Sequence, residues 1–321
     1  MPEYLKDIHM EILPKCLLLP IDGTSESLRP ITFIRRLYPV SEVSLILCYF
    51  LPPPAPVYFS RAAESAEMQK KKQDMADSRQ RDAERIFADA KKVLLKAGFS
   101  EELIQAHTQQ RQMSVAKQAC LLADIEKVDA VVIQKRVSSS LEGLLAGNTA
   151  SALLQYCLTS PAWFIEGDID PKSAAICIID EDAALRMADH AGFMLAGSSV
   201  EITLLQAVRK LPAPISFSLS DGLKEPPAYS GKTLSPEKYA YLQKAASILR
   251  DYGIEEGRIR ITLIPGRGDI ASEILSWCAS NGTGIVGLGH SEPQGIWSSL
   301  KTSVTRKILS EFKNMAIWVV Q

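Results

Sequence analysis

The run VDAVVIQKRVSSSLEGLLAGNTASALLQYCLTSPAWFIEG (128–167) carries the clearest fold signal in the chain. It begins with a short apolar stretch, passes through small and polar residues, and then gives a helical pattern followed by a second apolar stretch. A buried strand that leads into a helix and a further strand is typical of a parallel sheet with helices on both faces. Loops that follow such strands often hold nucleotides, so the run also predicts where a ligand would bind.

A second copy of this order follows in the other half of the chain. The run TGIVGLGHSEPQGIWSSLKTSVTRKILSEFKNMAIWVVQ (283–321) again gives strand, loop, helix and strand. Upstream, KCLLLPID (15–22) corresponds to AAICIID (174–180), and each stretch ends in an aspartate. The proline-bearing connections LPPPAPVYFS and KLPAPISFSLSDG correspond as well. The chain therefore reads as an internal repeat of alternating strands and helices.

This alternation predicts an α/β protein with two tandem, open, doubly wound parallel sheets, because right-handed crossovers place helices on both faces. We place the boundary in the link GDIDPKS (167–173), which gives domains 1–168 and 169–321. Ligands of such sheets bind beyond the carboxyl ends of the strands. Asp22, Asp180 and the loops after the fourth strands are expected at that edge.

The composition argues against several classes of protein. The 321 residues are 46% hydrophobic and 23% charged, with a net charge of −1, which disfavours a nucleic-acid-binding surface. No apolar run reaches the ~18 residues of a membrane span, and the first residues lack the apolar core of a signal peptide. The six cysteines form no CxxC pair, and several lie in apolar runs. We therefore expect buried thiols, without disulfides or a metal site, and a cytoplasmic location.

With these residues the chain resembles the universal stress protein family, as a tandem, two-domain member. The resemblance rests on LLLPIDGTSES (17–27) and on the runs 128–167 and 283–321, and covers nearly the whole chain. It implies three-layer domains of the adenine nucleotide alpha hydrolase-like or flavodoxin-like kind, with strand order 3-2-1-4-5. Members of the family commonly dimerise through the last strand. In a tandem chain this implies that PAWFIEG pairs with MAIWVVQ across a pseudo-twofold axis, which would cover an exposed edge.

ATP-binding members of this family carry the motif G-x2-G-x9-G-[ST] after the fourth strand. Glycines there let the backbone approach phosphates closely, and backbone N–H groups with a helix N-terminus hold the anion. In the first half the matching positions are Gln134, Val137, Gly147 and Asn148, with Thr149 as a further hydrogen-bond donor. In the second half they are Gly289, Glu292, Thr302 and Ser303.

Neither half keeps the full motif. Gln134 and Val137 add side chains where a phosphate would approach, although the charges of Lys135 and Arg136 would offset this. Glu292 places a carboxylate near the second cleft, which is unfavourable for a phosphate by Coulomb's law. The resemblance therefore implies two degenerate nucleotide clefts. A nucleoside or a monophosphate needs fewer close backbone contacts than a triphosphate, so these ligands stay open.

Three further features have alternative interpretations. Asp22 and Asp180 either contact the adenosine of a nucleotide or cap the helix that follows. The tripeptide RGD (267–269) reads as a turn in which Asp269 caps a helix. The connections 52–80 and 211–235 lie at the ligand edge, where long proline-bearing segments are often functional or disordered.

The first hypothesis for function is a non-enzymatic stress-response protein that acts as a binding or regulatory module. It follows because no nucleophile and base can be assembled from the sequence, so we predict no catalytic residues. The alternative is an ATP- or AMP-binding switch with slow or no hydrolysis, and an enzyme on an unnamed substrate also stays open. The expected cofactor is at most ATP or another adenine nucleotide. The expected partners are proteins or a second copy of the chain, and neither nucleic acid nor membrane.

Overall fold

We describe the fold from a computed structural model of the chain. The described residues are 14–53, 66–135, 154–179, 181–219, 226, 228–229, 232–290 and 299–321.

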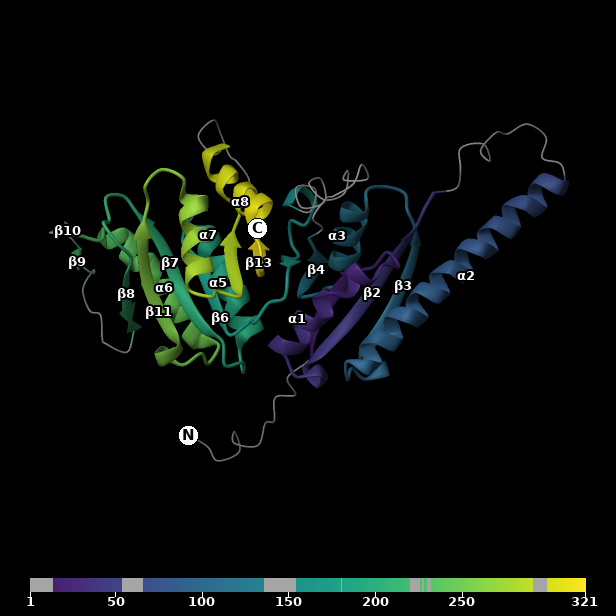
Figure 1. Cartoon of the computed structure of the whole chain (residues 1–321), viewed down its shortest axis with the longest axis horizontal. Helices are drawn as coiled ribbons and strands as arrows, with labels where there is room; N and C mark the ends of the chain where they lie inside the picture. Colours follow the sequence, from purple (N-terminus) through teal and green to yellow (C-terminus); the bar gives the residue numbers. More distant parts are fainter. Residues whose placement is uncertain are drawn as a thin grey trace, which may run out of the picture.

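One eleven-stranded sheet runs through the molecule, in the order β3-β2-β1-β4-β5-β13-β12-β6-β7-β11-β8 (Figure 1). The first half supplies β1 (Lys15–Pro20), β2 (Val43–Leu51), β3 (Ile104–Gln110), β4 (Ala130–Gln134) and β5 (Ala162–Glu166). The second half supplies β6 (Ser173–Cys177), β7 (Glu201–Val208), β8 (Ile215–Ser218), β11 (Ile259–Pro265), β12 (Ile285–Gly289) and β13 (Met315–Val320). The predicted order 3-2-1-4-5 is confirmed in each half, and the two predicted sheets form one continuous sheet.

The two halves join through β5 and β13, which pair antiparallel as predicted for PAWFIEG and MAIWVVQ. Within this pair Trp163 is the register partner of Trp318. Their rings are stacked, with centroids 4.0 Å apart and an interplanar angle of 3°, and both side chains are fully buried. Because a tryptophan faces its own counterpart here, this position marks the pseudo-twofold axis.

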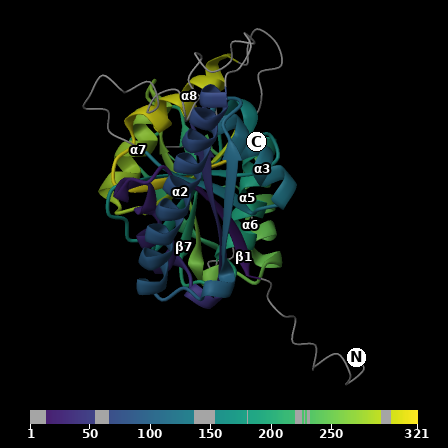
Figure 2. The ribbon, with the colours of Figure 1, turned by 90° about the vertical axis from the view of Figure 1, so that its right-hand side faces the viewer.

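Helices cover both faces of the sheet. One face shares an apolar core with α1 (Pro30–Leu37), α2 (Ala66–Lys96), α5 (Glu181–Leu195) and α6 (Pro236–Asp251). The other face packs on α3 (Val115–Glu126), α7 (Ile270–Ser280) and α8 (Ser299–Glu311). Figure 2 looks onto α2, which runs beside β3 at the outer end of the sheet. Within the described ranges, no helix has the length and apolar character needed to cross a membrane.

The two long connections differ in part from the prediction. Residues 66–80 belong to α2, which is 31 residues long and begins well before the apolar periodicity of its sequence. In the second connection β8 pairs antiparallel with β11, and β9 (Ala228–Tyr229) forms a small hairpin with β10 (Lys232–Thr233). The start of α2 is rich in Lys, Gln and Asp, so it carries no apolar stripe that the sequence pattern could detect.

The expectation that every cysteine is a free thiol is wrong. Cys120, in α3, forms a disulfide with Cys157, which follows the helical residues 154–156. Their Cα atoms are 5.0 Å apart, although the two residues are separated by 37 positions in the chain. Sequence spacing cannot indicate such a pair, because the fold alone brings the two segments together. Cys16, Cys48, Cys177 and Cys278 are free, as predicted.

Candidate functional site

Asp22 lies in the loop that follows β1. Its Oδ1 accepts hydrogen bonds from the backbone N–H of Thr24 at 3.0 Å and from the Thr24 hydroxyl at 2.6 Å. The short helix η2 (Ser25–Leu28) begins next, and its N-cap position is Thr24. Asp22 is therefore not the cap of that helix. Its carboxylate folds the loop into an Asx turn, and its exposed position leaves the adenosine interpretation open.

The residues at the end of β4 point to a structural role. The side-chain amide of Gln134 donates to the carbonyl of Lys135 at 3.1 Å, while its Oε1 is buried and has no hydrogen-bond partner among the described residues. Lys135 donates to the carbonyls of Ser310 and Phe312 at 3.0 Å each, at the end of α8. Its ammonium also lies 4.1 Å from the centre of the Phe312 ring. Lys135 is thus engaged with the second half. The expectation that its charge offsets the side chain of Gln134 at a phosphate is therefore wrong.

Gly289 ends β12 in the second half, at the first position of the glycine motif. A Cβ atom at this position would lie 2.1 Å from the carbonyl carbon and oxygen of Ala183 and 2.6 Å from the N of Ala184. Those atoms belong to the first turns of α5. Glycine is therefore required here by the close approach of α5 to the strand, which accounts for the residue without a phosphate.

A cavity of about 570 Å³ lies at the carboxyl ends of β6, β7 and β11. This is the edge at which ligands of doubly wound sheets bind. Its described lining comprises Ile178, Ile179, Gln206, Ala207, Val208, Arg209, Thr233, Leu234, Ser235, Lys238, Gly266, Gly268 and Ile270. The volume falls within the range of about 300–1,000 Å³ that is usual for small-molecule sites.

The polar groups of this cavity favour an anion. Arg209 and Lys238 bring two positive charges, and none of the described lining residues is acidic. Ser235 is the N-cap of α6, and its hydroxyl accepts from the backbone N–H of Lys238 at 3.4 Å. The positive end of the dipole of α6 therefore lies at the cavity. Asp269, beside the lining, is neutralised by an ion pair between its carboxylate and Lys307.

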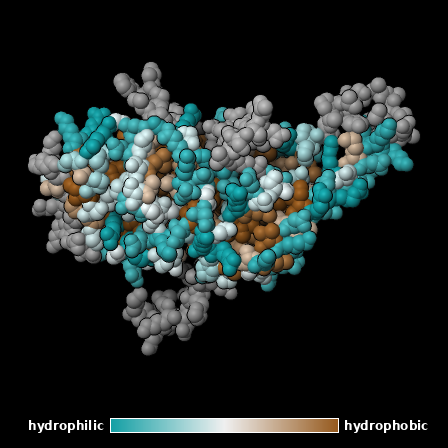
Figure 3. Space-filling view, viewed as in Figure 1, coloured by the Kyte–Doolittle hydropathy of each residue, from teal (hydrophilic) through white to brown (hydrophobic). Residues whose placement is uncertain are grey.

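The first half has a different cavity, of about 580 Å³. It lies between the β1–α1 loop and α2, and its lining includes Asp22, Arg85 and Asp89. In Figure 3 an apolar area extends over the first-half strands beside α2. Residues of α2 thus form one wall of the cavity, whose lining carries both signs of charge. Gln134 is not part of its described lining, so of the predicted first-half residues that the structure describes the cavity holds Asp22 and not Gln134.

Several predicted site residues lie outside the described residues: Val137, Gly147, Asn148, Thr149 and Asp180. Thr302 and Ser303 fall within α8, whose backbone is helical at both positions. Ile178 and Ile179, which line the second-half cavity, directly precede Asp180 in the chain. The structure thus places the neighbours of one predicted residue at a cavity and does not test the glycine loops.

Arg209, Lys238 and Gln206 were missed by the sequence analysis. The expectation that ligands bind beyond the carboxyl ends of the strands applied to Gln206 and Arg209, since both lie at the end of β7. Lys238 lies in the first turn of α6, three residues after its N-cap Ser235. The signals were present, but only the fold shows that these segments share one cavity.

Comparison with known proteins agrees with this architecture. Residues 15–160 match the model of the universal stress protein family. The crystal structure of a universal stress protein from Archaeoglobus fulgidus DSM 4304 is similar, with a TM-score of 0.59, 13% identity and coverage of 97% of each chain. A functionally unknown protein from Pseudomonas aeruginosa PAO1 gives a TM-score of 0.51 at 14% identity, over 96% of this chain and 93% of its own.

Shorter relatives match about half of the chain. One is a universal stress protein in complex with cAMP, which is 18% identical and covers 48% of this chain and 98% of its own, with a TM-score of 0.34. A search of curated proteins finds no match. Residues 15–160 thus match the universal stress protein family, and the chain as a whole has the fold of a tandem universal stress protein.

Proposed function

We propose that this chain is a non-enzymatic binding module whose second-half cavity takes an adenine nucleotide with few phosphates, such as AMP. The observation that carries the proposal is the cavity beyond β6, β7 and β11. Its apolar residues, such as Val208 and Ile270, suit a purine ring, while Arg209 and Lys238 suit a phosphate. The domain division at 168/169 is part of the proposal, because each half would then supply one cleft.

The same features favour binding without turnover. Hydrolysis of a triphosphate needs close backbone contacts along the phosphates, together with a group that positions water. The space beside Gly289 is filled by the backbone of α5, and Lys135 is engaged with α8. The first-half cleft is proposed as degenerate, because Gln134 has its side chain where a glycine would stand.

Isothermal titration of the full chain with AMP, ATP and cAMP tests this proposal. We expect saturable binding of one AMP per chain, and at least a tenfold loss of affinity in Arg209→Ala and in Lys238→Ala. Arg85→Ala, which changes the first-half cavity, is the matched control and should bind AMP as the parent chain does. Loss of binding in Arg85→Ala alone would move the site to the first half. Release of phosphate from ATP above the buffer rate would contradict the non-enzymatic part.

A further inference from the structure

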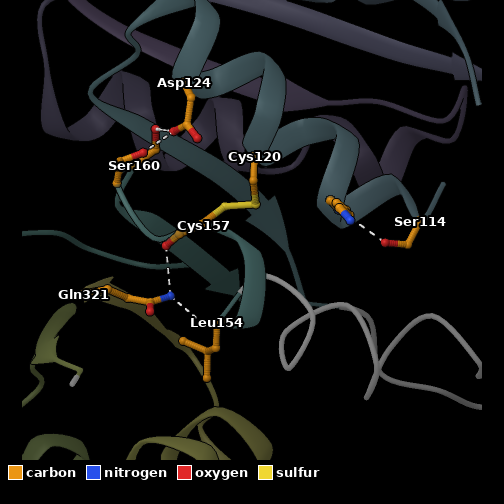
Figure 4. The surroundings of a disulfide bond; sticks show 9 residues. Ser114, Cys120, Asp124, Leu154, Cys157, Ser160 and Gln321 are labelled. Carbon is orange, nitrogen blue, oxygen red and sulfur yellow. Dashed lines mark hydrogen bonds between the residues drawn. A yellow bond between two sulfur atoms is a disulfide. The ribbon is translucent and has the colours of Figure 1, made fainter. Parts of the chain in front are cut away.

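The segment that follows the first-half loop is fastened to α3 by a covalent bond. Cys157 lies just after the helical residues 154–156, and Cys120 lies in the middle of α3 (Figure 4). The two residues are 2% and 1% exposed. We call residues 154–160, with their attachment to α3, the first-half joint.

In the second half the corresponding residues, 309–315, are held on the same face of the sheet as α7 without a disulfide. Cys120 and Leu275 lie at the same distance in sequence from the N-caps Ser114 and Asp269. Cys157 and Phe312 likewise precede the paired residues Trp163 and Trp318 by the same number of positions. Leu275 and Phe312 both pack in the apolar core on that face of the sheet. One half therefore uses apolar packing where the other uses a bond that reduction can open.

After reduction the first-half joint would keep hydrogen bonds and the packing of Leu154 and Tyr156 on the core, with the ammonium of Lys117 over the Tyr156 ring. Asp124 of α3 accepts from the hydroxyls of Thr159 and Ser160, the latter at 3.0 Å. The side-chain amide of Gln321 donates to the carbonyls of Leu154 at 2.5 Å and Cys157 at 2.9 Å (Figure 4). Hydrogen bonds of this kind contribute little net stability, and two cysteine thiols bury less apolar surface than a leucine and a phenylalanine. The local stability of the first-half joint therefore depends on whether Cys120 and Cys157 are oxidised.

The other cysteines do not share this arrangement. Burial raises the pKa of Cys48, Cys177 and Cys278, the last to about 12, so these thiols stay protonated in the folded chain. Cys177 and Cys278 lie in the second half and remain free thiols in the same structure that joins Cys120 to Cys157. They provide an internal reference for any oxidation experiment.

We propose that Cys120 and Cys157 form a reversible oxidation site that controls the local stability of the first-half joint and leaves the second half unchanged. The oxidant is a low-molecular-weight disulfide, RSSR. When the first-half joint opens locally, one cysteine thiolate attacks RSSR, which forms a mixed disulfide and releases RS⁻. The second thiolate then displaces a second RS⁻ and closes the Cys120–Cys157 bond. The two thiol protons pass to the two RS⁻ ions, so the protein loses two electrons and RSSR becomes two RSH. This site does not depend on the proposed nucleotide binding.

The full chain should be equilibrated with mixtures of reduced and oxidised dithiothreitol, quenched in acid, unfolded and alkylated. Peptide mass spectrometry should show Cys120 and Cys157 changing together in one two-electron transition, while Cys177 and Cys278 are alkylated in every mixture. Hydrogen exchange under native conditions should then be at least tenfold faster at residues 154–161 in the reduced chain. The corresponding residues 309–316 should exchange at one rate throughout. Full alkylation of Cys120 and Cys157 in the oxidising mixtures, or equal exchange at 154–161 in both states, would overturn the proposal.

Variants separate the redox effect from simple damage to the fold. Cys157→Ser should exchange rapidly at 154–161 in both buffers, and Cys278→Ser, a matched buried cysteine, should keep the redox response. If Cys157→Ser does not fold, the double variant Cys120→Leu with Cys157→Phe supplies the pair found in the second half. Its exchange at 154–161 should be slow and independent of the buffer. A redox response that survives in this double variant would also overturn the proposal.

Discussion

The two halves of the molecule share one strand order and differ at the contacts around it. In the second half α5 and α6 pack directly, since Gly192 lies against the ring of Tyr252 and Phe193 makes an edge contact with that ring. In the first half α1 is short, and a cavity separates the β1–α1 loop from α2. The two halves can therefore share one strand order while individual side chains determine where helices pack closely and where a cavity forms.

The outer strands show the same division. In the second half β8 pairs with β11 and extends the sheet beyond the third strand of the repeat. In the first half β3 is the terminal strand of the described sheet, and most of its side chains are exposed and polar. Polar residues on a terminal strand disfavour pairing with other chains. The outer edge of the sheet thus differs between the two halves.

The largest expected effect comes from removing the element that both halves share. Deletion of residues 316–321 removes all but the first residue of β13, which pairs with β5 on one side and β12 on the other. Because both halves lose a central neighbour, we expect aggregation and no cooperative unfolding transition. Size-exclusion chromatography and thermal melting provide the measurement, with deletion of Gln321 alone as the control. A monodisperse chain that melts like the parent after the longer deletion would show that the halves fold independently.

The stacked tryptophans allow a sharper test of how the two halves differ at the pseudo-twofold axis. The indole N–H of Trp163 donates to Nε2 of His190 at 3.0 Å, whereas that of Trp318 has no acceptor among the described residues. Trp163→Phe leaves a buried acceptor unpaired, so it should lower the free energy of unfolding by roughly 1–2 kcal/mol more than Trp318→Phe. Denaturant unfolding of the two variants measures this difference. Equal losses would mean that the hydrogen bond to His190 adds nothing.

His190 should make the protein sensitive to acid. Burial lowers the pKa of His190 from 6.5 to about 3, so the folded chain keeps this imidazole neutral while the unfolded chain binds a proton. The stability is therefore fully present above pH 6.5 and is lost as the pH falls toward 3. At about 1.4 kcal/mol per pH unit, His190 should account for a loss of roughly 3 kcal/mol between pH 6.5 and pH 4.

Denaturant unfolding at several pH values checks this dependence. His190→Gln retains an acceptor for Trp163 without a titrating group, so its stability should fall less over the same interval. His107→Gln is the matched control, because His107 lies at the first-half edge, where it is 3.7 Å from Glu126. An acid loss that is the same in His190→Gln as in the parent would contradict the assignment.

The smallest expected effect compares two helix caps at corresponding positions. Ser114 caps α3 through the N–H of Lys117, and its replacement by Ala should cost about 1 kcal/mol. Asp269 caps α7 and also pairs with Lys307, and this bond, with those from Ser272, lowers the pKa of Asp269 to about 2. Asp269→Ala should therefore lower the Tm more than Ser114→Ala. Asp269→Asn keeps a good cap without the charge, so its Tm should lie between that of Asp269→Ala and that of the parent chain. A Tm equal to that of the parent chain would mean that the ion pair contributes nothing.

Much of this fold could be predicted from the sequence, because the strands are apolar, regularly spaced and repeated. The pairing of β5 with β13 followed from the resemblance and from the cost of an exposed apolar edge. The start of α2 was placed within the connection 52–80, since its polar residues carry no periodic signal. The strand β8 was read as part of a connection, because four residues after a proline-rich stretch give too little pattern.

The site was less predictable than the fold. The glycine motif concerns one loop in each half, whereas the second-half cavity draws on three strand ends and the start of α6. Gly289 matched the motif, and the close approach of Ala183 is sufficient to account for the glycine without a ligand. The disulfide was missed for the same physical cause. Cys120 and Cys157 meet only when α3 and the segment before β5 fold against one sheet face.

The antiparallel contact between β5 and β13 has a consequence for assembly. Two separate copies joined through such a strand would part on dilution, and their stability would depend on protein concentration. Here a short link holds the two strands at a high effective concentration, so the contact forms within one chain at any dilution. A change in one half is also no longer duplicated in the other, as it would be in a symmetric pair. One copy of the fold is thus free to acquire a bond or a cavity that its counterpart lacks.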